Sequence, residues 1–222
     1  MIVKTFPLIR PGVFASKFKE IEFDSDSILV KPTLLSICAA DQRYYFGLRP
    51  SAVIQKKLPM VLIHEAIGQV VSSKVEHFSI GDPVILLPCG INASIDSNYQ
   101  ENAYFRSSNA DGFCQELVKL DASEVIKVSS CDSDDYVFSE LLSVCFQAIR
   151  QVGYELGSAN DIGVWGDGSL GFLMSYVIKS IFPTKFVTSI GKHEDKLEKF
   201  SFSDSTETIF ERTRKKIGRA HV

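Results

Sequence analysis

Residues 162–183 read IGVWGDGSLGFLMSYVIKSIFP, which is an apolar run of strand type, a glycine turn and an apolar helical run that ends at Pro183. A second strand pattern, KFVTSIG, follows at 185–191, and a charged helical pattern, HEDKLEKF, follows at 193–200. A strand, a helix and a strand in this order predict a βαβ unit, whose two strands lie parallel in one sheet. The sequence therefore predicts an α/β fold in this part of the chain.

The turn between the first strand and the helix has the sequence GDGSLG, with glycines at Gly166, Gly168 and Gly171. Glycines at these positions permit a tight turn and a close approach of the backbone to a pyrophosphate, and the helix N-terminus supplies free N–H groups. We therefore expect this turn, including Ser169 and Leu170, to bind a dinucleotide. The alternative is an ordinary flexible loop, but the strand before the turn and the helix after it favour the nucleotide.

The chain before about residue 130 is rich in strand patterns. The run IEFDSDSILVKPTLLSIC, residues 21–38, alternates polar and apolar residues around a Ser/Asp turn and predicts a pair of strands. Further strand patterns occur at 67–73, 81–88 and 112–120. Short strands with turns between them predict a small barrel or sandwich. The polar segment from Cys89 to Asn109 predicts a surface lobe.

Three residues far apart in the sequence could together hold a metal ion. Cys38 ends a strand-type run, His64 lies in LPMVLIHEAIGQVV, and Glu140 lies in the helical pattern of residues 134–152. A thiolate, an imidazole and a carboxylate suit a catalytic Zn²⁺, which keeps a fourth position open. Taken singly, each residue has a structural alternative, namely a buried free cysteine, a hydrogen-bonded histidine and a helix-capping glutamate.

Two further carboxylates lie beside these candidates. Asp41 could accept a hydrogen bond from the far nitrogen of His64 and so fix its tautomer, although a turn-forming or capping aspartate is the alternative. Glu65 could exchange onto the metal while substrate or water enters, or it could balance charge next to the metal ligands. The sequence leaves both roles of Glu65 open.

Composition limits the classes of function. The 222 residues carry a net charge of −3, which gives no reason to expect a nucleic-acid partner, and no apolar run reaches the length of a membrane span. The N-terminus lacks the pattern of a signal peptide. Five scattered cysteines without paired spacing favour reduced thiols, so we expect a cytoplasmic protein.

The motifs SICAAD, IHEAIGQVV, DGFCQELV, SELLSVCFQAI and VWGDGSLG resemble the successive signatures of the zinc-dependent medium-chain dehydrogenases, in their polyol dehydrogenase branch. SICAADQRYYFG, KLPMVLIHE, YFRSSNADGF and WGDGSLG are similar to the ribulose-5-phosphate reductases within that family. The resemblance implies a GroES-like zinc-binding barrel, a Rossmann domain for NADPH and the reduction of ribulose 5-phosphate to ribitol 5-phosphate. It also implies a cytidylyltransferase partner, in teichoic acid or capsule synthesis, and a homo-oligomer.

Two departures from the family pattern change these expectations. The four closely spaced cysteines of a structural zinc lobe are missing between Cys89 and Cys114, so we expect one zinc ion. Ala40 stands where many relatives carry a proton-relaying serine or threonine, so the proton would come from water or from Tyr44.

Cationic residues are the candidates for binding phosphate. Arg43, Arg49 and Arg106 could bind the substrate phosphate, with a solvated surface arginine as the alternative for each. By alignment with the family, Gly191 stands where an NAD-binding acid would be, and Lys192 follows it. A missing carboxylate and an added cation both favour the 2′-phosphate of NADPH.

The resemblance implies a division into a GroES-like domain at 1–145, a partial Rossmann domain at 146–210 and a tail at 211–222 that is foreign to the fold. Family members are longer, so we expect a C-terminally truncated fragment. Three alternatives remain: a zinc-binding fragment without turnover, another zinc polyol or alcohol dehydrogenase, and a zinc-free quinone-reductase-like enzyme. The presence of all three zinc ligands argues against the last of these.

Overall fold

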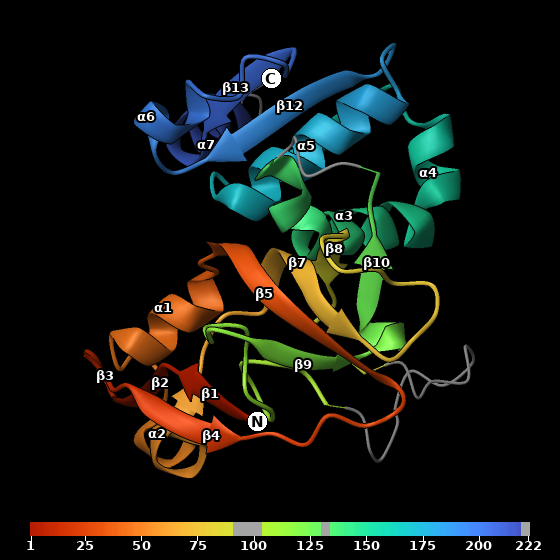
Figure 1. Ribbon diagram of the computed structural model, residues 1–222. Coiled ribbons are helices and arrows are strands. Elements are labelled where there is room, and N and C mark those ends of the chain that lie inside the picture. The colour runs from red at the N-terminus through yellow and green to blue at the C-terminus, as the bar shows by residue number, and fades with distance from the viewer. Residues whose placement is uncertain (91–103, 130–133, 219–222) are drawn as a thin grey trace. The chain divides into compact units, whose positions relative to one another are not determined.

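The computed structural model describes residues 1–90, 104–129 and 134–218 (Figure 1). The chain divides into two compact units, Met1–Glu140 and Leu141–Val222. Cys131 and most of the segment expected to form a surface lobe lie outside the described residues. Within the described part of the chain, no helix is both long enough and apolar enough to cross a membrane.

The first unit consists mainly of antiparallel strands, which alternate with short helices. Its elements are β1 (Ile2–Thr5), β2 (Pro7–Arg10), β3 (Val13–Phe14), β4 (Lys17–Glu20), β5 (Ser27–Ser36), α1 (Ala39–Tyr45), α2 (Ser51–Lys57), β6 (Met60–Val61), β7 (Glu65–Ser73), β8 (Pro83–Leu86), β9 (Val118–Asp121), η1 (Ala122–Glu124), β10 (Val125–Lys127) and η2 (Asp134–Phe138).

A five-stranded antiparallel sheet in the order β10-β8-β7-β5-β9 forms the centre of this unit. Its buried face is apolar and includes Ile28, Val30, Val70 and Val84, and Phe113 from the segment before β9 belongs to the same core cluster. The pairing of β5 with β7 extends to Ser36 opposite Glu65. That register matters for function, because it places the residues that follow β5 beside the residues that precede β7.

Two strands are predicted within residues 21–38, and the prediction is wrong for the first of them. Only residues 27–36 form a strand, while residues 21–24 are irregular. The strand before this segment is β4, which pairs with β1 rather than with β5. Alternating polarity marks a segment as compatible with a strand, but the pairing partner decides whether the strand forms.

The second unit contains a three-stranded parallel sheet in the order β11-β12-β13. Its elements are α3 (Ser139–Gln151, which begins in the first unit), α4 (Gly153–Ser158), β11 (Asp161–Trp165), α5 (Ser169–Ile181), β12 (Phe186–Gly191), α6 (Glu194–Leu197), β13 (Ser205–Thr208) and α7 (Ile209–Gly218). The predicted strand, helix and strand are therefore present as β11, α5 and β12.

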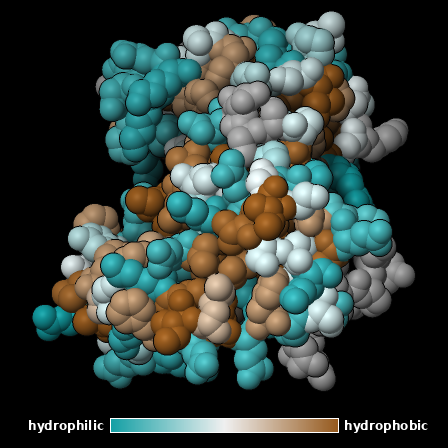
Figure 2. Space-filling model, viewed as in Figure 1, coloured by the Kyte–Doolittle hydropathy of each residue, from teal (hydrophilic) through white to brown (hydrophobic). Residues whose placement is uncertain are grey.

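The core of the second unit lies between α3, α5 and the sheet. Its buried members include Cys145, Ile149, Val164, Val177 and Val187. Figure 2 shows a hydrophilic surface where α6 lies at the upper left, which agrees with the charged residues of that helix. The segment 211–222, predicted to be foreign to the fold, is helical as far as Gly218, and its origin stays a prediction.

Candidate active site

The first turn of α1 places Cys38 and Asp41. Cys38 is the N-cap residue, and Asp41, at the third helical position, accepts a hydrogen bond from the Cys38 amide at 3.2 Å. This is a capping box in which a cysteine takes the position that serine or threonine usually holds. The cap orders the backbone from which the thiol projects, at the end of the long strand β5.

Asp41 also fixes the segment that carries His64. Its carboxylate is only 2% exposed and accepts hydrogen bonds from the Ile63 amide at 3.1 Å and from the Ser107 hydroxyl at 2.6 Å. Ile63 and Ser107 are the two residues other than glycine with positive φ in the described part of the chain. Such conformations cost about 1–3 kcal/mol each and persist where the surroundings impose them. The buried Asp41 carboxylate is the group that both residues contact.

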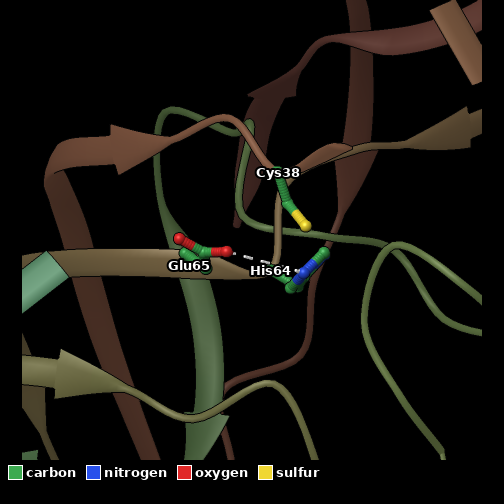
Figure 3. Close-up of side chains that lie close together, drawn as sticks. All are labelled: Cys38, His64 and Glu65. Atoms are coloured by element: carbon green, nitrogen blue, oxygen red, sulfur yellow. Dashed lines mark ion pairs between the residues drawn. The ribbon is translucent and has the colours of Figure 1, made fainter. Parts of the chain in front are cut away.

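Cys38, His64 and Glu65 point toward one another from the start of α1 and the start of β7 (Figure 3). One potential ligand atom from each side chain lies within 4.8 Å of the others. His64 Nδ1 lies 3.8 Å from Asp41 Oδ2, and His64 Nε2 lies 3.9 Å from Glu65 Oε1. A thiolate, an imidazole and a carboxylate are ligands that Zn²⁺ prefers, so the donor set fits this metal.

Glu140 lies outside this close group of three, although its charge acts on the group. Burial raises the pKa of Glu140, the neighbouring His64 lowers it and the neighbouring Glu65 raises it, so that the pKa stands above its usual range. The set predicted from the sequence was Cys38, His64 and Glu140, with Glu65 in an exchanging role. The grouping found here brings Glu65 in first, and the part of Glu140 stays a prediction.

The protonation of His64 is under opposing influences. Burial lowers the pKa of His64, while the hydrogen bond to Cys38 and the charges of Asp41 and Glu140 raise it, and the net result is a raised pKa. A metal must displace that proton before it can bind the imidazole. We therefore infer that lowering the pH weakens the binding of any metal at this site, because protons compete with the metal for His64.

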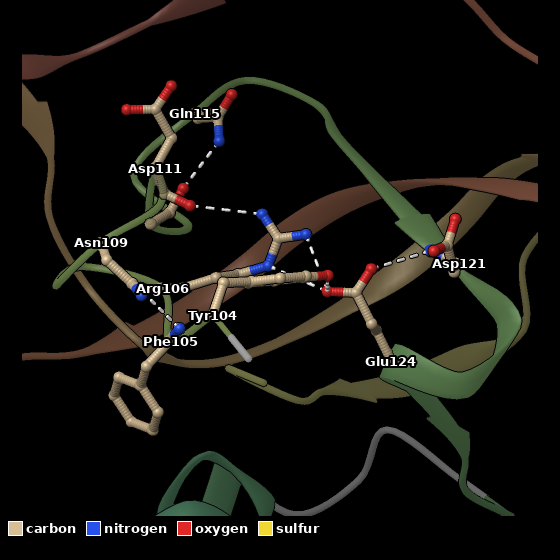
Figure 4. Close-up of polar contacts among 9 residues, drawn as sticks. Tyr104, Phe105, Arg106, Asn109, Asp111, Gln115, Asp121 and Glu124 are labelled. Carbon is tan, nitrogen blue, oxygen red and sulfur yellow. Dashed lines mark hydrogen bonds and ion pairs between the residues drawn. The ribbon is translucent and has the colours of Figure 1, made fainter. Parts of the chain in front are cut away.

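Arg106, a candidate for binding the substrate phosphate, is engaged elsewhere (Figure 4). Its Nη2 lies 2.9 Å from Glu124 Oε1, its Nη1 donates to the Asp111 carbonyl oxygen at 3.2 Å, and its side chain is 12% exposed. Glu124 also accepts a hydrogen bond from the Tyr104 hydroxyl. A guanidinium that is held in a buried ion pair is less available to substrate, which weakens the case for Arg106, and its role as a phosphate ligand stays a prediction.

The other candidates on and after α1 have different surroundings. The Tyr44 ring is buried with Leu8 and Ile63, and the Arg49 guanidinium lies over it at 5.1 Å. That packing makes Tyr44 a core residue and weakens its case as a proton donor. Arg43 is exposed, and it remains the candidate for the substrate phosphate.

The glycine turn is built as the motif predicts. Gly168 is the N-cap of α5, and Ser169 and Leu170 begin that helix. A Cβ at Gly171 would lie 2.0 Å from the Gly166 carbonyl oxygen, so only glycine permits the helix to pack this closely on the turn. The backbone N–H groups in the first turn of α5 therefore lie next to the glycine turn, where a pyrophosphate can approach them closely.

Sequence reasoning missed Asp167, the residue between the first two glycines. Its Oδ2 accepts hydrogen bonds from the Lys192 amide at 2.7 Å and the His193 amide at 2.8 Å, and it lies 2.8 Å from His193 Nδ1. Burial raises the pKa of Asp167, but these donors lower it to about 2. The sequence does show an acid inside the motif. It does not show that the partners of this acid lie 25 and 26 residues later along the chain.

The chain belongs to the medium-chain dehydrogenase/reductase family, and residues 24–130 match the alcohol dehydrogenase GroES-like domain. This confirms the predicted fold class, a GroES-like domain followed by a Rossmann-type parallel sheet. Within the family, the chain is 36% identical over 209 residues to ribulose-5-phosphate reductase 1 of Staphylococcus aureus, with 92% of this chain and 61% of that protein covered. It is 37% identical over 214 residues to the ribulose-5-phosphate reductase of Bacillus spizizenii, with 94% and 63% covered.

Solved structures agree with this placement. The crystal structure of S. aureus TarJ in complex with NADPH is 32% identical, with a TM-score of 0.78, and covers 95% of this chain and 60% of its own. The L-idonate 5-dehydrogenase of Escherichia coli, at 21% identity and a TM-score of 0.82, supports the fold alone. The chain thus spans about three fifths of the length of TarJ and of the two curated relatives.

Proposed function

We propose that Cys38, His64 and one or both of Glu65 and Glu140 hold a single catalytic zinc ion. The observation that supports this most is the convergence of a thiol, an imidazole and a carboxylate within 4.8 Å at the end of the β5–β7 pair. When bound, zinc would act as a Lewis acid that polarises a carbonyl group. Asp41 would orient His64 through Nδ1, as carboxylates behind metal-bound histidines do.

We propose that the protein to which this chain belongs reduces D-ribulose 5-phosphate to D-ribitol 5-phosphate with NADPH. The reductase names of the relatives and the NADPH complex of TarJ support this substrate and this cofactor. The turn from Gly166 to Gly171 would bind the pyrophosphate, and Lys192 would favour the 2′-phosphate. The ketone carbon gains a hydride and its oxygen gains a proton, for which water is the donor we favour, since Tyr44 is buried.

The product would supply CDP-ribitol synthesis for teichoic acid or capsule, so a cytidylyltransferase is the partner we propose. Arg43, exposed on α1 five positions after Cys38, is the proposed phosphate ligand. Assembly into a homo-oligomer stays a prediction.

A second candidate function is zinc binding without turnover by the 222-residue chain. A dinucleotide lies across two βαβαβ halves, and the described sheet, with three parallel strands, supplies one of them. We expect this chain to contain zinc by elemental analysis but to oxidise no NADPH with ribulose 5-phosphate, whereas the complete reading frame that contains it does both. A complete enzyme that lacks this reductase activity would refute the proposed reaction, and turnover by the 222-residue chain would refute the second candidate.

Ser107 offers a test of the proposed zinc site from outside its ligands. Ser107→Ala removes a hydroxyl that donates to Asp41 at 2.6 Å, so Asp41 holds His64 less firmly. We expect zinc affinity to fall by about 10- to 100-fold, the range found for partners behind metal ligands. Competition with a chromogenic chelator measures it, and Ser108→Ala is the neighbouring control. Equal zinc affinity in both variants would show that Ser107 and Asp41 do not support the zinc site.

A further inference from the structure

Asp167 stands at the end of the second strand of the parallel sheet, although it belongs to the loop after the first. A Cβ placed on Gly191 would lie 2.6 Å from the Asp167 Cβ and 2.8 Å from its Oδ2. The Asp167 carboxylate therefore occupies the space into which a side chain at residue 191 would project.

In a Rossmann-type fold, the side chain at this place helps to select between NAD and NADP. An acid at the end of the second strand accepts a hydrogen bond from the ribose 2′-OH of NAD, while a 2′-phosphate calls for a nearby cation instead. Gly191 removes the acid from the usual position in the sequence, but Asp167 brings a carboxylate back from the neighbouring loop. Although residue 191 itself is not an acid, a negative charge is therefore still present at the end of the second strand.

The surroundings fit a nucleotide site. A hollow of about 450 Å³ is lined by Trp165, Asp167, Gly191, Lys192 and His193, among others. The Asp167 side chain is 15% exposed, so it is in reach of a molecule in that hollow. The amides of Lys192 and His193, which could otherwise donate to a phosphate, already donate to Asp167.

We propose that Asp167 is a specificity-determining residue, which limits the preference for 2′-phosphorylated nucleotides by holding a carboxylate beside the ribose 2′ position. Lys192 acts in the opposite sense, since its cation attracts the same phosphate. The selectivity is the difference between these two effects. This inference rests on the proposed use of a nicotinamide dinucleotide and refines the expectation drawn from Gly191 and Lys192.

The test compares two ligands that differ only at the 2′ position, adenosine 2′,5′-bisphosphate and adenosine 5′-monophosphate. Trp165 is the single tryptophan of the chain and lines the hollow, so its fluorescence reports binding without any need for turnover. Calorimetry gives a second measurement of both dissociation constants.

We expect Asp167→Asn to raise the preference for the bisphosphate by about tenfold and Lys192→Ala to lower it by about tenfold, since one charge is removed in each case. The gain from Asp167→Asn should shrink at high salt, because screening weakens the interaction between a partly exposed charge and the phosphate. A merely structural role of Asp167 would weaken both ligands equally and would show no such salt dependence.

A preference that is unchanged or reduced in Asp167→Asn would overturn the inference. If that variant does not fold, as judged by circular dichroism, Asp167→Ser repeats the test, because a hydroxyl can still accept one amide hydrogen bond. If the wild-type chain binds neither ligand, the nucleotide site itself is refuted. Binding of both ligands with an unchanged preference refutes only the role of Asp167.

Discussion

Cys38→Ser should reduce the zinc content of the chain from about one ion per molecule to almost none, because the thiolate is the softest and most basic of the proposed ligands. Serine keeps the local fold. Cys38 is an N-cap residue, and serine is among the most favourable residues at that position. The change therefore removes a metal ligand with little cost to α1, which separates loss of zinc from loss of structure.

Cys114→Ser is the matched control for this experiment. Cys114 is a half-buried free thiol that packs on the Leu8 and Met60 cluster and lies outside the group of three. Elemental analysis after dialysis against a weak chelator should find zinc retained in this variant. Full zinc content in both Cys38→Ser and His64→Ala would refute the proposed site.

Glu124→Ala should lower the free energy of unfolding by about 3–5 kcal/mol, the cost of leaving the partner of a buried ion pair uncompensated. Glu124 is 2% exposed, pairs with Arg106 at 2.9 Å and accepts a hydrogen bond from the Asp121 amide at 2.9 Å. Its loss would leave the Arg106 guanidinium without its ion-pair partner and the Tyr104 hydroxyl without its acceptor on Glu124 (Figure 4). Urea denaturation measures the effect, and the exposed Glu116→Ala should stay within about 0.5 kcal/mol of the wild type.

A double variant distinguishes an ion pair from a simple loss of packing. Glu124→Leu with Arg106→Met replaces both charges by apolar groups of similar size, which is often close to neutral for buried pairs. We expect it to be more stable than Glu124→Ala. A loss below about 1 kcal/mol in Glu124→Ala would show that the pair is solvated, and Arg106 would then be a stronger candidate for the substrate phosphate.

The amino-acid sequence by itself determined the fold class and the local form of both proposed sites. The strand, glycine turn and helix of residues 162–183 appear as β11, Gly166–Gly171 and α5, because hydrophobic period and glycine positions are local properties. Cys38 and His64, which the sequence named together, also lie in one close group, and the pairing of Ser36 with Glu65 explains why. The ligand set of the zinc site stays a prediction.

Only the tertiary structure decided which partners the polar side chains find. It places Glu65 rather than Glu140 in the close group, engages Arg106 with Glu124, and sets Asp167 over Gly191. Each of these outcomes joins segments that are distant along the chain or that come from different elements. Strand register and close packing bring such segments together, and both depend on the whole fold, so a local pattern can name the residues for a site but not the contacts that give each residue its role.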